Sequence, residues 1–142
     1  MNGPYYSKST KDLCAEDPRY TAAGTPEDLY WILRHVWAKD TCAPRMQDRW
    51  SEADCTLGHC SVTSFLVQDI YGGEVYGIPL PDGNYHCFNC VNGTDFDLTA
   101  EQFRDEELLY THAYPQKRSV HFAKAEKYER YLKLKKRLED AL

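Results

Sequence analysis

The sequence has no long apolar run and no surplus of positive charge. None of its apolar stretches approaches the roughly 20 residues that a membrane-spanning helix needs, and the opening residues MNGPYYSKSTKD lack the apolar core of a secretory signal. The formal net charge is −5, whereas a nucleic-acid backbone or an anionic membrane attracts a basic surface. We therefore expect a cytoplasmic protein with neither nucleic acid nor a membrane as its partner.

Cysteines are too few for a disulfide scaffold. Six of them are spread over 142 residues, and without an export signal their thiols should be reduced. A reduced cysteine can fill the core, bind a metal or act as a nucleophile. The apolar fraction of 42% and the aromatic fraction of 13% indicate a folded chain of ordinary size. We expect an irregular N-terminal arm over residues 1–24 and a single α+β domain over residues 25–142.

Apolar periodicity predicts a buried central helix on a small antiparallel sheet. Helical patterns cover residues 25–40, 58–71, 99–110 and 119–142, and strand patterns cover residues 74–80, 85–91 and 94–98. The second helix is apolar around most of its circumference, which is typical of a buried helix. The expected fold is therefore α+β, with about three strands and flanking helices. The stripe of the last helix is expected to pack in the core or to join two copies as a homodimer.

Cys60 stands where the central helix begins. The first N–H groups of a helix have no intrahelical acceptor, and the helix dipole places partial positive charge at that end. Both effects favour a thiolate, which becomes a useful nucleophile when a histidine lies within reach. The Cys60 backbone N–H is then a candidate donor to an oxyanion, and His59 is an alternative second donor.

His86 and Asp97 lie on neighbouring strands whose pairing the sequence specifies. A two-residue type I′ turn at Asn92-Gly93 would place Cys90 opposite Asp95 and bring His86 and Asp97 onto one face as diagonal neighbours, about 7–8 Å apart. The carboxylate could then hold one ring nitrogen and leave the other for a thiol. The hypothesis is a triad of Cys60, His86 and Asp97 that needs no cofactor. It would act on an amide or ester of a small molecule or peptide, by hydrolysis or acyl transfer.

A non-catalytic binding module, stabilised by zinc or without metal, is the alternative. Cys55, Cys60, Cys87 and Cys90 resemble a zinc-ligand set, and Cys87-x-x-Cys90 is a common half-site. Two features weaken the zinc version. The spacing of Cys55 and Cys60 is wider than usual, and a regular strand points Cys87 and Cys90 to opposite faces.

A set of short motifs between residues 28 and 104 carries a resemblance to a known family. The motifs are Trp50-Ser51, GHCSVT at 58–63, VQD at 67–69, GGE at 72–74, Tyr85-His86, Phe88-Asn89, DLT at 97–99 and Gln102-Phe103. In this order they resemble the YunG-like family of small uncharacterised bacterial proteins. The resemblance implies a fold similar to papain-like cysteine hydrolases, with Cys60, His86 and Asp97 at the matching positions. It implies no substrate.

The chain departs from the family pattern near the proposed site. The residue before the cysteine is commonly Gln in that family, where this chain has His59, and the histidine strand there lacks Cys87 and Cys90. These departures keep a metal site specific to this chain among the alternatives. A papain-like relic that kept the fold and lost the chemistry is a further alternative.

Overall fold

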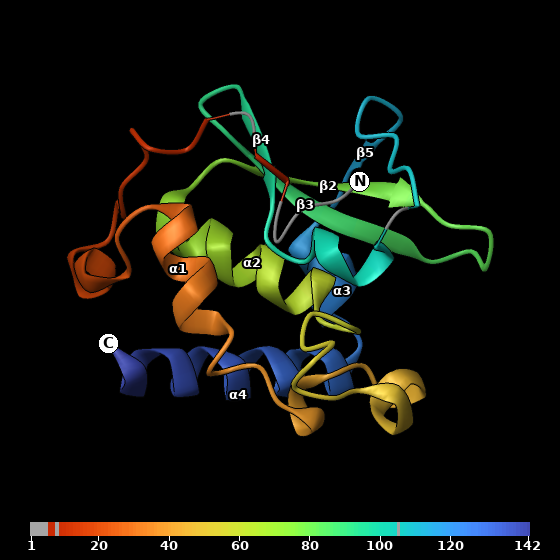
Figure 1. Cartoon of the computed structure of the whole chain (residues 1–142). Helices are drawn as coiled ribbons and strands as arrows, with labels where there is room; N and C mark the ends of the chain where they lie inside the picture. Colours follow the sequence, from red (N-terminus) through yellow and green to blue (C-terminus); the bar gives the residue numbers. More distant parts are fainter. Residues whose placement is uncertain (1–5, 8, 105) are drawn as a thin grey trace.

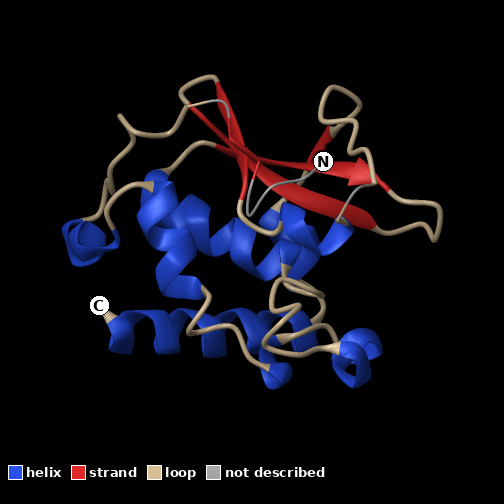
Figure 2. Cartoon of the chain, viewed as in Figure 1, coloured by secondary structure: helices blue, strands red, loops and turns tan. Residues whose placement is uncertain are grey.

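The structure is a computed structural model that describes residues 6–7, 9–104 and 106–142. Its strands form one antiparallel sheet in the order β1-β4-β3-β2-β5, and the helices gather on one face of that sheet (Figure 2). The strands are β1 (Tyr6–Ser7), β2 (Glu74–Pro79), β3 (Tyr85–Val91), β4 (Thr94–Asp97) and β5 (Tyr114–Pro115). The α-helices are α1 (Pro26–Leu33), α2 (Cys60–Tyr71), α3 (Arg118–Phe122) and α4 (Ala125–Ala141). Short 3₁₀ turns are η1 (Pro18–Ala23), η2 (Lys39–Thr41), η3 (Pro44–Arg49) and η4 (Ala100–Phe103).

The α+β class is correct, but the expected count of about three strands is too low. The three strands of the expected meander are β2, β3 and β4, and the sheet has five strands because β1 and β5 extend its two edges. Each added strand has two residues. Two residues are too few to show an alternating pattern in the sequence. Only their pairing in the folded sheet identifies these strands.

The β3–β4 hairpin has the register that the turn predicts. Cys90 pairs with Asp95 and Val91 with Thr94. Asn92 and Gly93 both have positive φ, 52° and 78°, as a type I′ turn requires. The hairpin that carries His86 and Asp97 is therefore specified locally.

Helix α2 forms the centre of the molecule. It lies between the sheet and α4 (Figure 1), and most of its residues from Val62 onward are buried. Gly72, with φ 78°, ends it as the glycine pair predicts. Within the described residues no helix is long and apolar enough to cross a membrane.

Three other helical expectations are too long. Helix α1 starts as expected, with Thr25 and Asp28 in a reciprocal capping box, but ends at Leu33 instead of near residue 40. The pattern at 99–110 yields only the turn η4, which ends at Arg104, a residue with a left-handed φ of 54°. The last helix is divided into α3 and α4, since Lys124 is extended with ψ 105°.

The N-terminal arm is less independent than expected. Among its described residues, Tyr20 and Ala23 are buried in the core, and Tyr6 and Ser7 pair with β4. The part of this expectation that concerns residues 1–5 and 8 lies outside the described residues.

The apolar stripe of α4 packs within the chain. Tyr131, Leu134 and Leu138 are buried in the same core cluster as α2. The stripe therefore has a partner in its own chain, and a homodimer through this helix stays a prediction.

Gly58, two residues before Cys60, occupies a position that only glycine fits. Its φ is 72°, and a Cβ there would lie 2.5 Å from Cys42 Sγ and 3.0 Å from the Ala43 nitrogen. Backbone in this region is strained for any L side chain, and here the space is filled as well.

Replacement of Gly58 by alanine should lower the free energy of unfolding by roughly 1–3 kcal/mol. Gly83→Ala is the matched control, because Gly83 also has positive φ (88°) but nothing lies within 4 Å of the position that a Cβ would take there. Urea unfolding of both variants separates backbone strain from the clash. An equal loss in the two variants would show that the close approach at Gly58 contributes nothing.

Candidate functional site

Cys60 lies at the first residue of α2 and is partly exposed. Its Sγ is 3.8 Å from the carbonyl oxygen of Tyr85, the first residue of β3. The helix start thus meets the start of the histidine strand. Helix geometry leaves the first-turn N–H groups free to favour negative charge at this sulfur.

His59 is a structural residue that holds the start of α2. It is fully buried, and its Nδ1 donates to the Leu57 carbonyl oxygen at 2.9 Å. A neutral ring then accepts at Nε2 from the Thr41 hydroxyl, at 2.7 Å. Burial is the main reason that its pKa falls to about 4. Because both ring nitrogens are used inside the protein, His59 cannot be the second oxyanion donor.

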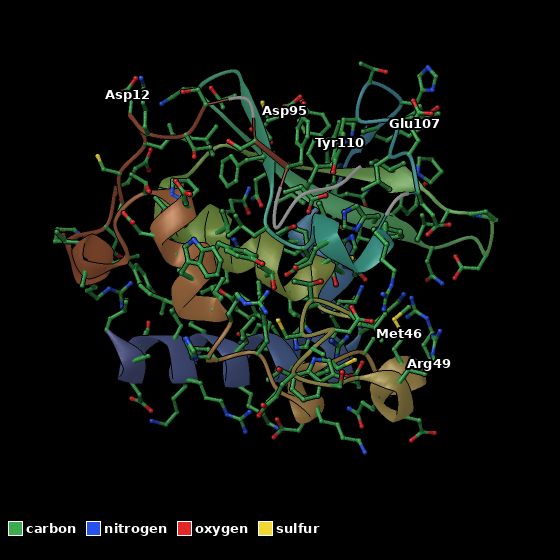
Figure 3. All side chains as sticks on the ribbon, in the orientation of Figure 1. Asp12, Met46, Arg49, Asp95, Glu107 and Tyr110 are labelled. Atoms are coloured by element: carbon green, nitrogen blue, oxygen red, sulfur yellow. The ribbon has the colours of Figure 1, made fainter. Side chains whose placement is uncertain are left out.

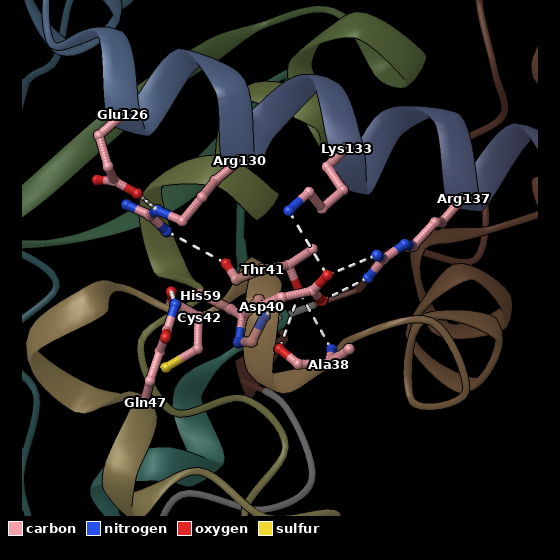
Figure 4. A network of polar contacts seen from close by, with 10 residues as sticks. All are labelled: Ala38, Asp40, Thr41, Cys42, Gln47, His59, Glu126, Arg130, Lys133 and Arg137. Atoms are coloured by element: carbon pink, nitrogen blue, oxygen red, sulfur yellow. Dashed lines mark hydrogen bonds and ion pairs between the residues drawn. The ribbon is translucent and has the colours of Figure 1, made fainter.

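Helix α4 supports this segment from one side (Figure 4). The Arg130 guanidinium donates to the Thr41 carbonyl oxygen at 3.2 Å and is ion-paired with Glu126. Arg137 forms two hydrogen bonds of 2.6 Å with the Asp40 carboxylate. Residues 40 and 41 are thus fixed by α4, and Thr41 in turn contacts the residue before Cys60.

His86 and Asp97 form a buried pair. The distance from His86 Nε2 to Asp97 Oδ2 is 2.6 Å, and both residues are at most 1% exposed. The same carboxylate accepts from the Tyr110 hydroxyl at 2.8 Å and from the Thr99 backbone N–H at 3.1 Å. The two strands and the segments around residues 99 and 110 therefore fix the ring through one carboxylate.

The body of α2 packs on the face of the hairpin opposite to the one that carries His86 and Asp97. Asn89 donates to the Ser64 carbonyl oxygen at 2.9 Å, and the Phe96 ring meets Tyr71. Side chains alternate along a strand, so Phe88 projects to the opposite side, where its ring meets Tyr110. Tyr110, labelled in Figure 3, lies over the sheet. Cys60 and His86 nevertheless line the same cleft, because the start of the helix lies at the start of β3.

The thiol of Cys60 has a pKa well below its ordinary value. The largest cause is a hydrogen bond from the Cys87 thiol, and the hydrogen bond and charge of His86 lower it further against the opposing effect of burial. The pKa of Cys87 is raised in turn by the same contact. The two opposite shifts favour the thiolate at Cys60 and the protonated thiol at the buried neighbour Cys87.

The protonated, positively charged form of the His86 ring is stabilised. Burial opposes the charge, but the Asp97 charge, the hydrogen bond to Asp97 and the contact with Cys60 together raise its pKa to about 10. Its second nitrogen, Nδ1, is buried and makes no hydrogen bond of ordinary geometry among the described residues. Nδ1 is thus the ring nitrogen that Asp97 does not occupy.

Cys60 and His86 line a cleft of about 450 Å³. Its walls come from the residues before α2, the β2–β3 connection, η3, η4 and the α3–α4 corner. A larger hollow of about 810 Å³ adjoins it and shares Met46, Leu80, Phe103 and Glu106. Neither Cys60 nor His86 lines the larger hollow. The smaller cleft is therefore the candidate site.

Several residues around the site were not singled out for this role by the sequence. Cys87 is a neighbour of the nucleophile candidate, whereas the sequence suggests core filler or a zinc ligand. His121 and Lys127 line the cleft. Tyr110 holds Asp97. No local signal could have found them, because they come from distant parts of the chain.

The structure gives no geometric support to the zinc alternative. Among the described residues, no three His, Cys, Asp or Glu side chains are grouped so that they could hold a metal ion. Cys87 is fully buried, whereas Cys90 is partly exposed. This difference agrees with the expectation that the two side chains project to opposite faces of the strand.

The fold and the site together define an α+β protein in which a helix-start cysteine shares a cleft with a buried histidine–aspartate pair. The family model described as YunG protein matches residues 25–142. This chain therefore belongs to the YunG family. It is 31% identical over 78 residues, 55% of its length, to the uncharacterized protein YunG of Bacillus subtilis (strain 168). That match spans 63% of the relative's length. No solved structure matches the chain.

Replacement of Cys87 by alanine should move the alkylation profile of Cys60 to higher pH. The change removes the thiol that donates to the Cys60 thiolate. The rate of iodoacetamide labelling at Cys60, followed by mass spectrometry over a pH series, measures the shift. Cys87→Ser should leave the pH profile of Cys60 alkylation where it is in the wild type, because the serine hydroxyl can donate a hydrogen bond to the sulfur of Cys60. Cys90→Ala is the control on the same strand. A profile unchanged in Cys87→Ala would contradict the assigned hydrogen bond.

Acidification should destabilise the fold through His59. The pKa of His59 is about 4 in the folded state against the usual 6.5, so the unfolded chain binds more protons between these values. The free energy of unfolding is therefore unaffected by His59 above pH 6.5. It decreases as the pH falls towards 4, and His59 accounts for roughly 3 kcal/mol of this decrease. Urea unfolding across this range should show a smaller loss in His59→Gln than in the wild type. The control His35→Gln, at an exposed position, should show the same loss as the wild type. An equal loss of the free energy of unfolding in all three proteins would refute the assignment of this loss to His59.

Proposed function

We propose that the protein is a thiol-dependent acyl hydrolase or acyltransferase in which Cys60, His86 and Asp97 act together. The observation that carries the proposal is the environment of Cys60, a partly exposed residue whose thiol has a lowered pKa and which shares a cleft with an imidazole fixed by a buried carboxylate. Perturbed thiols and imidazoles that share a cleft are typical of nucleophilic catalysis.

The chemistry assigns one role to each residue. The Cys60 thiolate attacks the carbonyl carbon of an amide or ester and forms a C–S bond. When the bond from carbon to the leaving nitrogen or oxygen breaks, protonated His86 gives its proton to the leaving group. Water, or an acceptor amine or alcohol, then loses a proton to His86 and attacks the thioester, which releases the acyl product and the thiolate. Asp97 keeps the ring oriented throughout.

Oxyanion stabilisation on this proposal comes first from the start of α2. The Cys60 backbone N–H belongs to the first turn and has no intrahelical acceptor. Gln102 contributes to the position of this segment, since its Oε1 accepts from the Gly58 N–H at 3.3 Å and its Nε2 donates to the Thr99 carbonyl oxygen at 3.0 Å. This side chain thereby links the cysteine segment to the segment that follows Asp97.

The proposed similarity to papain-like hydrolases rests on the order and roles of the three residues. The cysteine begins a buried helix, the histidine follows on a strand, and the carboxylate lies on the next antiparallel strand. The same roles recur on unrelated folds, so the order of the residues supports the chemistry more directly than it supports shared ancestry. A relic without activity would keep the geometry but lose turnover.

The first test compares cysteine reactivities within one protein. Cys60 should react with iodoacetamide nearly as fast at about pH 6 as at about pH 8, whereas an ordinary exposed thiol slows roughly tenfold for each pH unit. Exposed Cys14 is the internal reference. A Cys60 that reacts no faster than Cys14 at about pH 6 would remove the main support for catalysis.

The second test measures turnover of 4-nitrophenyl esters. Cys60→Ser should abolish the thioester intermediate, which mass spectrometry detects in the wild type, and His86→Gln should lower kcat/KM roughly 10²- to 10⁴-fold. Asp97→Asn should also lower it, while Asp95→Asn, on the same strand, controls for the loss of one carboxylate. Turnover without any acyl-enzyme, or turnover that survives Cys60→Ser, would overturn the proposal.

A further inference from the structure

The cleft around Cys60 concentrates positive charge in a chain whose net charge is −5. Among the described residues that line it, the cationic side chains are Arg45, Arg49, Lys124, Lys127 and Arg130. Glu106 is the only acidic residue in the same described lining. The surplus is therefore local, and it opposes the charge of the whole molecule.

Part of this charge has no counter-ion within the part of the chain that the structure describes. Arg130 is ion-paired with Glu126, so its charge is offset. Among the described residues, Arg49 and Lys124 form no ion pair, and both are exposed. They come from η3 and from the α3–α4 corner, two separate walls of the cleft.

The positive charge in the cleft affects the neighbouring side chain of His121. Lys127 is half-buried, and its Nζ donates to His121 Nδ1 at 2.9 Å. Burial first, and then the charge of Lys127, lower the pKa of His121 to about 4, so the ring is neutral and only accepts at this nitrogen. The His121 ring therefore holds the ammonium group at the cleft without neutralising it. The start of α2 adds partial positive charge at the same place.

We propose that the group transferred through Cys60 carries a negative charge close to the reacting carbonyl carbon, a carboxylate or a comparable anion. The inference rests on the proposed function, because it identifies the class of substrate for the same nucleophile. A cleft lined by one sign of charge concentrates ions of the other sign and raises their association rates roughly tenfold or more. Neutral and cationic acyl compounds gain nothing from this field.

Two alkylating agents that differ in charge test the field at the sulfur. Iodoacetate is anionic and iodoacetamide is neutral, and both form the same C–S bond to Cys60 with loss of iodide. The ratio of their rates at Cys60, divided by the ratio at exposed Cys14, should be roughly tenfold in favour of iodoacetate and should fall as salt rises from about 0.02 to about 0.5 M.

Charge-removing variants assign the effect to the cleft. Arg49→Gln and Lys124→Gln should each lower the normalised ratio severalfold, and the double variant should lower it further. Lys136→Gln removes the same charge from the far end of α4, where Lys136 is ion-paired with Asp140, and should leave the ratio unchanged. Urea unfolding checks that the variants remain folded.

A pair of esters extends the test to acyl transfer. 4-Nitrophenyl hemisuccinate should show a higher kcat/KM than 4-nitrophenyl pentanoate, which has a neutral chain, and the preference should weaken in the double variant. If Cys60 reacts with both alkylating agents and neither pair of probes shows a preference for the anion, the charge inference is refuted and the nucleophile stands. If Cys60 reacts no faster than Cys14 with either agent, the proposed function and this inference both fail.

Discussion

The hydrogen bond between His86 and Asp97 is the interaction on which the site depends. Both groups are buried, and an ionised carboxylate without partners would be costly there. Asp97 avoids that cost by accepting from His86, Tyr110 and Thr99. These contacts bring the chain around residues 99 and 110 onto the strand that carries the histidine. The same contacts fix which ring nitrogen points away from Asp97 and is open to the thiol.

The sulfur is held by a second group of contacts, which Gln102 joins to the first through Gly58 and Thr99. Helix α4 fixes Thr41, Thr41 fixes His59, and His59 precedes Cys60. Gly58 allows the tight approach of this loop to Cys42. The nucleophile candidate thus depends on the last helix of the chain, and the imidazole depends on the hairpin. The two groups meet because the start of α2 reaches the beginning of β3.

Much of the fold could be predicted because its signals are local. The Thr25 cap, the buried periodicity of α2, the glycine pair after it and the Asn92-Gly93 turn act within a few residues, and the structure has each of them. The edge strands β1 and β5 could not be predicted, since two residues show no periodicity. The helix expected over residues 99–110 is too long because a helical pattern permits a helix but does not supply the tertiary packing that extends one.

The sequence alone determined the pairing of the hairpin, and with it the meeting of His86 and Asp97, because a two-residue turn leaves only one register. It also determined that Cys60 begins a buried helix. Tertiary structure decided which side of the hairpin the helix covers, that Cys87 affects the pKa of Cys60, and that Arg49 and Lys124 line one cleft. These outcomes depend on how segments more than twenty residues apart share one core, and no short-range pattern records that packing.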